Sequence, residues 1–119
     1  MSFLFWTYIL NALLLINHEI DSAYWNEWKL FRMKGGIGGF LAFNVIAVFI
    51  AIVGIVPVYL QTFAGVIFSW LMALTGILTF CIHITFMAKG RKEFKTFPSL
   101  VILSGILIVS ILEIIAILL

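Results

Sequence analysis

Four long runs of apolar residues occupy nearly the whole of this 119-residue sequence. A bilayer core is crossed by roughly 17 to 25 helical residues, and each of the four runs reaches that length. Lipid cannot satisfy exposed backbone polar groups, so runs this long and unbroken must be helices rather than barrel strands. The sequence therefore predicts an all-α, polytopic membrane protein built as a four-transmembrane-helix bundle.

The composition supports one membrane domain over residues 1–119. Hydrophobic residues make up 65% of the chain and charged residues 10%, whereas a soluble domain carries roughly 25% charged residues. No proline or glycine lies between Ser2 and Met33, so the first helix is expected to continue past the hydrocarbon until the Gly35–Gly39 segment ends it. We expect helices over about residues 3–33, 37–58, 64–88 and 98–119.

All seven basic residues lie in two connectors, after the first and third helices: Lys29, Arg32, Lys34, Lys89, Arg91, Lys92 and Lys95. With four crossings these connectors share one side, and the positive-inside rule makes that side cytoplasmic. Both termini are then extracytoplasmic, and the expected location is a bacterial inner membrane. The net charge of +2 indicates contact with anionic lipid rather than nucleic acid.

The stretch NHEIDSAYWNEW, residues 17–28, concentrates polar groups in this apolar chain. Counting from Phe3, His18 lies roughly 22 Å into the membrane, still within the hydrocarbon. Interfacial anchoring by tryptophans with snorkelling polar side chains is one reading. The other is an inward-facing polar stripe, because helical spacing places four side chains along one face: Asn11, His18, Ser22 and Trp25.

Two further polar residues are expected in the same layer. His83 ends a small and polar seam on the third helix, and its depth is close to that of His18. Asn44 enters from the cytoplasmic side on the second helix, at roughly 10 Å from the boundary. Intramembrane ionisable groups are costly and usually functional, so we expect these groups to meet inside the bundle.

A second polar group is expected nearer the extracytoplasmic face. Asn11 and Glu113 both lie roughly 9 to 12 Å below that boundary. A carboxyl group at this depth should be neutral or hydrogen-bonded, with Asn11, Thr7 or Ser110 as partners. A structural role and a proton relay through Asn11 and Glu113 are both open.

The segment His18–Trp25 resembles the H-x-x-E-E signature of small bacterial HXXEE-type membrane proteins. The longer stretch HEIDSAYWNEWKLF, followed by Gly-Gly, looks like a related domain-of-unknown-function group of similar length. Asp21 and Ser22 stand where that signature has its two glutamates. The resemblance implies a four-helix membrane protein in which this segment is a site, and it implies no particular reaction.

These residues favour binding of a small ligand or metal ion in the cytoplasmic leaflet. A divalent metal would be held by His18, Asp21 and His83, whereas haem between the two histidines is less favoured. Catalysis on a membrane-embedded substrate would use His18 and Asp21 as acid and base. The expected ligand-binding residues are Glu19, Ser22, Trp25, Asn44 and His83.

A proton- or ion-coupled transporter or channel is the main alternative, and an accessory subunit of a membrane complex is another. The sequence leaves open whether the protein is an enzyme. Small residues recur at every fourth position in Gly65, Ser69 and Ala73, and such seams let helices approach closely within a chain or between chains. A homo-oligomer is therefore also expected.

Overall fold

The computed structural model describes residues 2–25, 29, 35–90 and 96–119. Over these residues the chain is helical, without strands. Its elements in order are α1 (Phe3–Tyr24), α2 (Gly36–Val53), α3 (Ile55–Tyr59), α4 (Phe63–Ala88) and α5 (Phe97–Leu118). Four helical spans, with α2 and α3 counted as one, are long and apolar enough to cross a membrane. The predicted fold class is confirmed, and the chain has the character of a multi-pass membrane protein.

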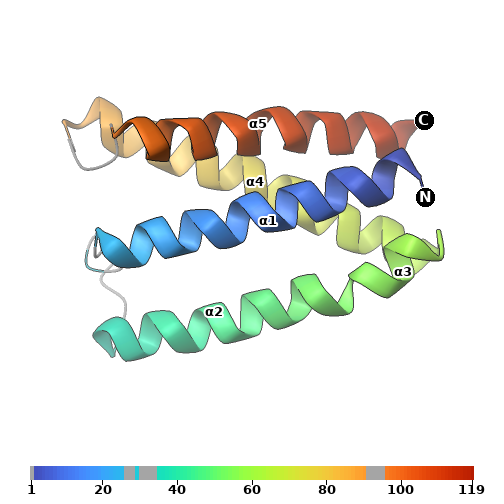
Figure 1. Ribbon diagram of the computed structural model, residues 1–119, viewed down its shortest axis with the longest axis horizontal. Helices are drawn as coiled ribbons and strands as arrows, with labels where there is room; N and C mark the ends of the chain where they lie inside the picture. Colours follow the sequence, from blue (N-terminus) through green and yellow to red (C-terminus); the bar gives the residue numbers. More distant parts are fainter. Residues whose placement is uncertain (1, 26–28, 30–34, 91–95) are drawn as a thin grey trace.

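The helices form a bundle in which α5 packs along both α1 and α4 (Figure 1). The two chain ends lie at the same end of the bundle, together with the short helix α3. Helix α2 is joined to the bundle mainly at that end and stands apart from α1 at the other (Figure 1). Of the residues of α2, all of which are described, Phe40 alone is buried. This loose packing of α2 leaves space beside α1 and α4.

Helix α1 is shorter than the predicted span of residues 3–33. It begins after an N-cap in which Ser2 Oγ accepts a hydrogen bond from the Phe5 amide, and it ends at Tyr24. Its last turns contain carboxylates and no basic residue. Negative charge is unfavourable at the carbonyl end of a helix, which gives a physical reason for ending there. The predicted continuation also covers residues 26–28 and 30–34, which lie outside the described residues.

The second predicted helix, residues 37–58, is divided at Gly54 into α2 and α3. Pro57 has no backbone N–H, and its ring crowds the carbonyl four residues earlier, which breaks the regular helix. Gly54 fits there because a Cβ at this position would meet the Tyr8 hydroxyl and the Phe68 ring. Tyr8 Oη donates a hydrogen bond of 2.6 Å to the Ala51 carbonyl. This bond holds the C-terminal end of α2 against α1.

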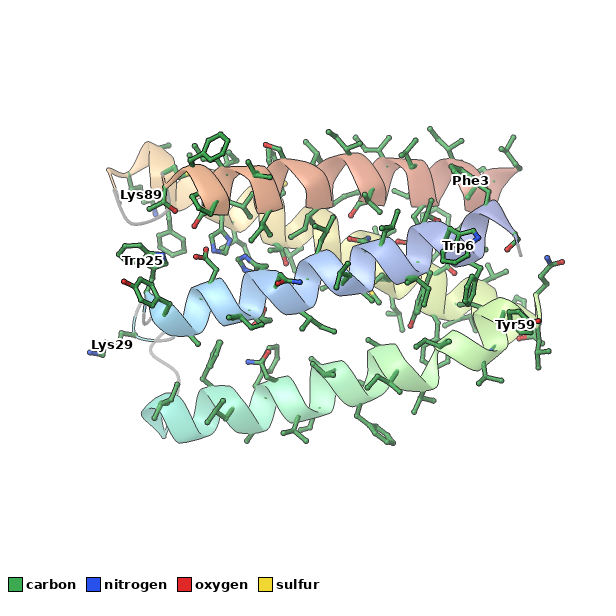
Figure 2. All side chains as sticks on the ribbon, in the orientation of Figure 1. Phe3, Trp6, Trp25, Lys29, Tyr59 and Lys89 are labelled. Carbon is green, nitrogen blue, oxygen red and sulfur yellow. The ribbon has the colours of Figure 1, made fainter. Side chains whose placement is uncertain are left out.

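Aromatic residues mark the two ends of the bundle (Figure 2). Phe3, Trp6 and Tyr59 lie at the end with the termini. Trp25 lies at the opposite end with Lys29 and Lys89. Such a distribution is typical of the two interfaces of a membrane.

The small residues of α4 are used inside the chain. Gly65 and Gly76 are buried, and a Cβ at either would overlap another helix: the Pro57 carbonyl of α3 for Gly65 and Ser110 Oγ of α5 for Gly76. The seam predicted from the sequence therefore brings α4 against α3 and α5.

Candidate ligand site and buried polar groups

The structure places His18 of α1 beside His83 of α4. Their ring centroids are 4.4 Å apart and the rings are nearly perpendicular, at 87°. Each side chain is only 4% exposed. The two imidazoles therefore form an edge-to-face pair inside the bundle.

The hydrogen bonds of the pair indicate where its protons lie. Nδ1 of His83 is 2.9 Å from the Thr79 carbonyl, which can only accept, so Nδ1 carries a proton. In the neutral ring the lone pair is then on Nε2. Nε2 of His18 is 3.3 Å from the hydroxyl of Ser22, one turn further along α1. A neutral His83 thus presents a hydrogen-bond acceptor.

A cavity of about 570 Å³ adjoins the histidines and lies between α2 and the pair formed by α1 and α4. Tyr8 and Ser22 both line it, so it extends along fourteen residues of α1, roughly 21 Å at 1.5 Å per residue. Apolar side chains form most of its wall. Tyr8, Thr75 and Thr79 also line it, and its other polar side chains lie toward the end away from the chain termini: His18, Glu19, Ser22, Asn44 and His83.

Asn44 lines the cavity from α2. Its Nδ2 donates to the Phe40 carbonyl at 2.9 Å. Its Oδ1 is buried and has no hydrogen-bond partner among the described residues. Because an unpaired buried acceptor costs about 1–3 kcal/mol, this oxygen is suited to receive a donor from a ligand.

Asp21 is hydrogen-bonded to α5. Ser99 donates a 2.6 Å hydrogen bond to Asp21 Oδ2, and Thr96 donates to Ser99 at 2.7 Å. Within the described part of the chain, no group of three or more His, Cys, Asp or Glu side chains is placed to hold a metal ion. The predicted ligand set of His18, Asp21 and His83 is therefore not assembled.

Trp25 lies at the end of the predicted stripe rather than deep within it. It is the C-cap of α1, is partly buried, and packs edge-to-face on Tyr24 with ring centroids 4.8 Å apart. Asn11, His18 and Ser22 are buried along the same helix. Glu27 and Trp28, which belong to the same NHEIDSAYWNEW stretch, lie outside the described residues.

A second buried polar group joins α1 to α5. Asn11 Nδ2 donates to Ser110 Oγ at 3.0 Å and to Glu113 Oε1 at 2.9 Å. All three side chains have 0% exposure. Residues 12–16, all apolar, lie between Asn11 and the adjacent polar residues Asn17 and His18. The chain thus holds two polar groups at different depths.

Sequence reasoning missed two residues that position these groups. Ser99 was not expected to bind Asp21, and Tyr8 was not expected to hold α2. Both contacts join residues far apart in the sequence, and neither residue type is unusual in a membrane helix. The spacing of Ser99 and Ser110 along one face of α5 was the available signal for the polar side of that helix.

Residues 4–119 match the model of DUF6713, a family of unknown function. The chain belongs to this family. Neither the curated proteins nor the solved structures yielded a match. Membership of the DUF6713 family supports the expectation of an uncharacterised membrane-protein family, while the specific link to HXXEE-type proteins and a bacterial source is not established by it.

Proposed function

We propose that the protein binds a lipid-soluble amphiphile in the cavity beside α2, with the polar head of the ligand at the His18–His83 pair. The observation that carries this proposal is the form of the cavity: about 570 Å³, long, mostly apolar, and polar toward one end. Binding sites for small molecules are typically apolar cavities with a few polar groups that fix orientation. A single acyl or alkyl chain beside α1 fits this distribution.

The polar lining favours a head group that donates hydrogen bonds. Asn44 Oδ1 lacks a partner among the described residues, and His83, whose Nδ1 is bonded to the Thr79 carbonyl, lines the same cavity. Glu19 adds a carboxyl group, and the described residues that line the cavity include no lysine or arginine. We therefore propose an alcohol or amine head rather than a phosphate.

Binding is favoured over transport because the two polar groups are separated. Residues 12–16 of α1 are apolar, and Asn11 and His18 are seven residues apart, roughly 10 Å along the helix. Direct proton transfer needs groups within hydrogen-bond reach, about 3 Å. Any acid–base chemistry on a bound head group would fall to His18 and His83, since Asp21 is held by Ser99.

The head-group preference can be tested by photolabelling in nanodiscs with three diazirine probes that share a hexadecyl chain. Their head groups are an alcohol, an amine and a phosphate. The alcohol and amine should label peptides of α2 and α4 more strongly than the phosphate. In His83→Ala their labelling should fall about tenfold, as expected when one buried hydrogen bond of about 1–3 kcal/mol is lost. Thr85→Ala is the control, because Thr85 is exposed and bonds only the Cys81 carbonyl of its own helix.

Unchanged labelling in His83→Ala, or a preference for the phosphate, would contradict this proposal. Metal analysis of the same samples tests the other predicted ligand. A stoichiometric divalent metal that disappears in His83→Ala would replace the amphiphile proposal with a metal site.

We further propose that the protein lies in a bacterial inner membrane with both termini extracytoplasmic. The support is that Lys29 and Lys89 lie at the end of the bundle opposite the termini (Figure 2), and cytoplasmic loops are rich in basic residues. A C-terminal alkaline phosphatase fusion should be active in bacterial cells and a C-terminal green fluorescent protein fusion dark. The opposite pair of results would reverse the orientation.

A further inference from the structure

The buried group of Asn11, Ser110 and Glu113 is distinct from the ligand cavity and is incompletely satisfied. Only the neutral amide of Asn11 is seen to donate to Glu113. Glu113 Oε2 and Asn11 Oδ1 are both buried without a hydrogen-bond partner among the described residues. In an apolar surrounding, unpaired polar atoms and an uncompensated carboxylate are both costly. A small cation or hydrogen-bond donor bound at this group would therefore lower its energetic cost.

No positively charged side chain faces Glu113 from the helices packed around it. From α1 the titratable neighbour is the phenol of Tyr8, which interacts electrostatically with Glu113. Helix α5 has no other titratable residue. On α4, Gly76 faces the group, and the titratable residues Cys81 and His83 lie five and seven residues further along the helix. Within the described structure, the missing charge is thus not supplied by the protein.

The volume at the group is small. A Cβ at Gly76 would overlap Ser110 Oγ and would lie 3.3 Å from Asn11 Oδ1. Helices α1, α4 and α5 therefore meet closely there, which favours the smallest species. A proton on Glu113 Oε2 removes the charge and turns an unpaired acceptor into a donor.

A second cavity, of about 290 Å³, lies at the end of the bundle with the chain termini. Ser2, Gln61 and Thr62 give it polar walls, and Gly65 and Ala116 lie along it. Ala116 is three residues after Glu113, so the two lie on one face of α5, roughly 5 Å apart along the axis. In the other direction along α1, the apolar residues 12–16 lie between Asn11 and the adjacent Asn17 and His18.

We propose that Glu113, held by Asn11 and Ser110, is a proton-binding site that exchanges protons with the end of the bundle carrying the termini. The apolar residues 12–16 of α1 lie on the side of this group that faces the histidine pair. The site does not depend on ligand binding at the histidine pair.

The protonation of Glu113 can be measured by infrared spectroscopy of the protein in nanodiscs. The wild-type spectrum should contain the C=O band of a protonated carboxylic acid at neutral pH, and this band should be absent from Glu113→Gln. A carboxylate band from Glu113 at neutral pH would overturn the proposal. So would conversion of the acid band to the carboxylate band when sodium chloride replaces choline chloride at fixed pH, because the site would then bind Na⁺.

A chemical probe tests the protonation of Glu113 in the wild-type protein, without relying on the Glu113→Gln variant. Dicyclohexylcarbodiimide adds to protonated carboxyl groups in membranes, and peptide mass spectrometry of the wild-type protein should locate the adduct on Glu113. Labelling should slow as the pH is raised. Absence of the Glu113 adduct over the whole pH range would contradict the assignment.

The route of exchange is tested by deuterium exchange of the same acid band. Ala116→Phe narrows the cavity and should slow exchange about tenfold or more, equivalent to roughly 1.4 kcal/mol in the barrier. Ala64→Phe is the matched control, since Ala64 is exposed near the same end and does not line the cavity. Equal exchange rates in the two variants would refute this route.

Discussion

Gly76→Ala is expected to destabilise the bundle by about 1–3 kcal/mol, the usual cost of adding a methyl group to a tightly packed interior. The added Cβ would overlap Ser110 Oγ and would lie 3.2 Å from Ile106 Cγ2. Both neighbours are fully buried and lie on α5. Helices α4 and α5 would have to move apart. Reversible unfolding in mixed detergent micelles measures the change in the free energy of unfolding.

Two comparisons separate this contact from a general effect of removing glycine. Gly38→Ala in α2 should be neutral or stabilising by up to about 1 kcal/mol, since alanine favours a helix more than glycine and nothing lies within 4 Å of a Cβ there. In Gly76→Ala combined with Ser110→Ala, the overlapping oxygen is absent and part of the stability should return. If the two losses simply add, the proposed contact with Ser110 is wrong.

The fold class could be predicted from the sequence because a bilayer imposes strong rules on length and polarity. Three of the four spans lie near their predicted limits. The structure differs from the prediction at the end of the first helix and inside the second span. The absence of proline and glycine before Met33 suggested one long helix, yet α1 ends at Tyr24. The apolar character of residues 37–58 masked the break that Gly54 and Pro57 introduce. Apolar composition reports membrane depth better than it reports helix continuity.

The candidate site was predictable as far as depth and helix face determine it. These two quantities place His18, His83 and Asn44 in one layer, and all three line the same cavity. They do not determine rotation of one helix against another. For that reason the sequence grouped Asp21 with the histidines, whereas Ser99 of α5 binds it.

The cavity itself was beyond prediction because it results from the loose packing of α2. Its volume depends on the angle at Gly54 and on the Tyr8–Ala51 hydrogen bond. Gly54 and Pro57 signal a break in the helix, but the direction that α2 takes and the Tyr8–Ala51 contact are tertiary features. The span Gly36–Tyr59, formed by α2 and α3, also has the smallest buried share of the four spans, 11%. A mobile or weakly packed wall is suited to a site that admits ligands from the surrounding lipid.

Filling the cavity from α2 should remove amphiphile binding without altering the histidines. Ala47 lines the cavity, and in Ala47→Trp the indole would occupy the space of the proposed alkyl chain. We expect photolabelling by the hexadecyl alcohol probe to fall by at least about tenfold, a loss of roughly 1.4 kcal/mol or more in binding. The alcohol probe and nanodiscs used for His83→Ala serve here as well.

Ala42→Trp provides the matched control. Ala42 lies on the same helix and is exposed like Ala47, but it does not line the cavity. Five residues of a helix correspond to about 500° of rotation, so the two side chains point about 140° apart. Ala42→Trp should therefore label like the wild type. Equal labelling of the two variants would place the probe outside the cavity, because only Ala47→Trp reduces the space between α2 and the histidine pair.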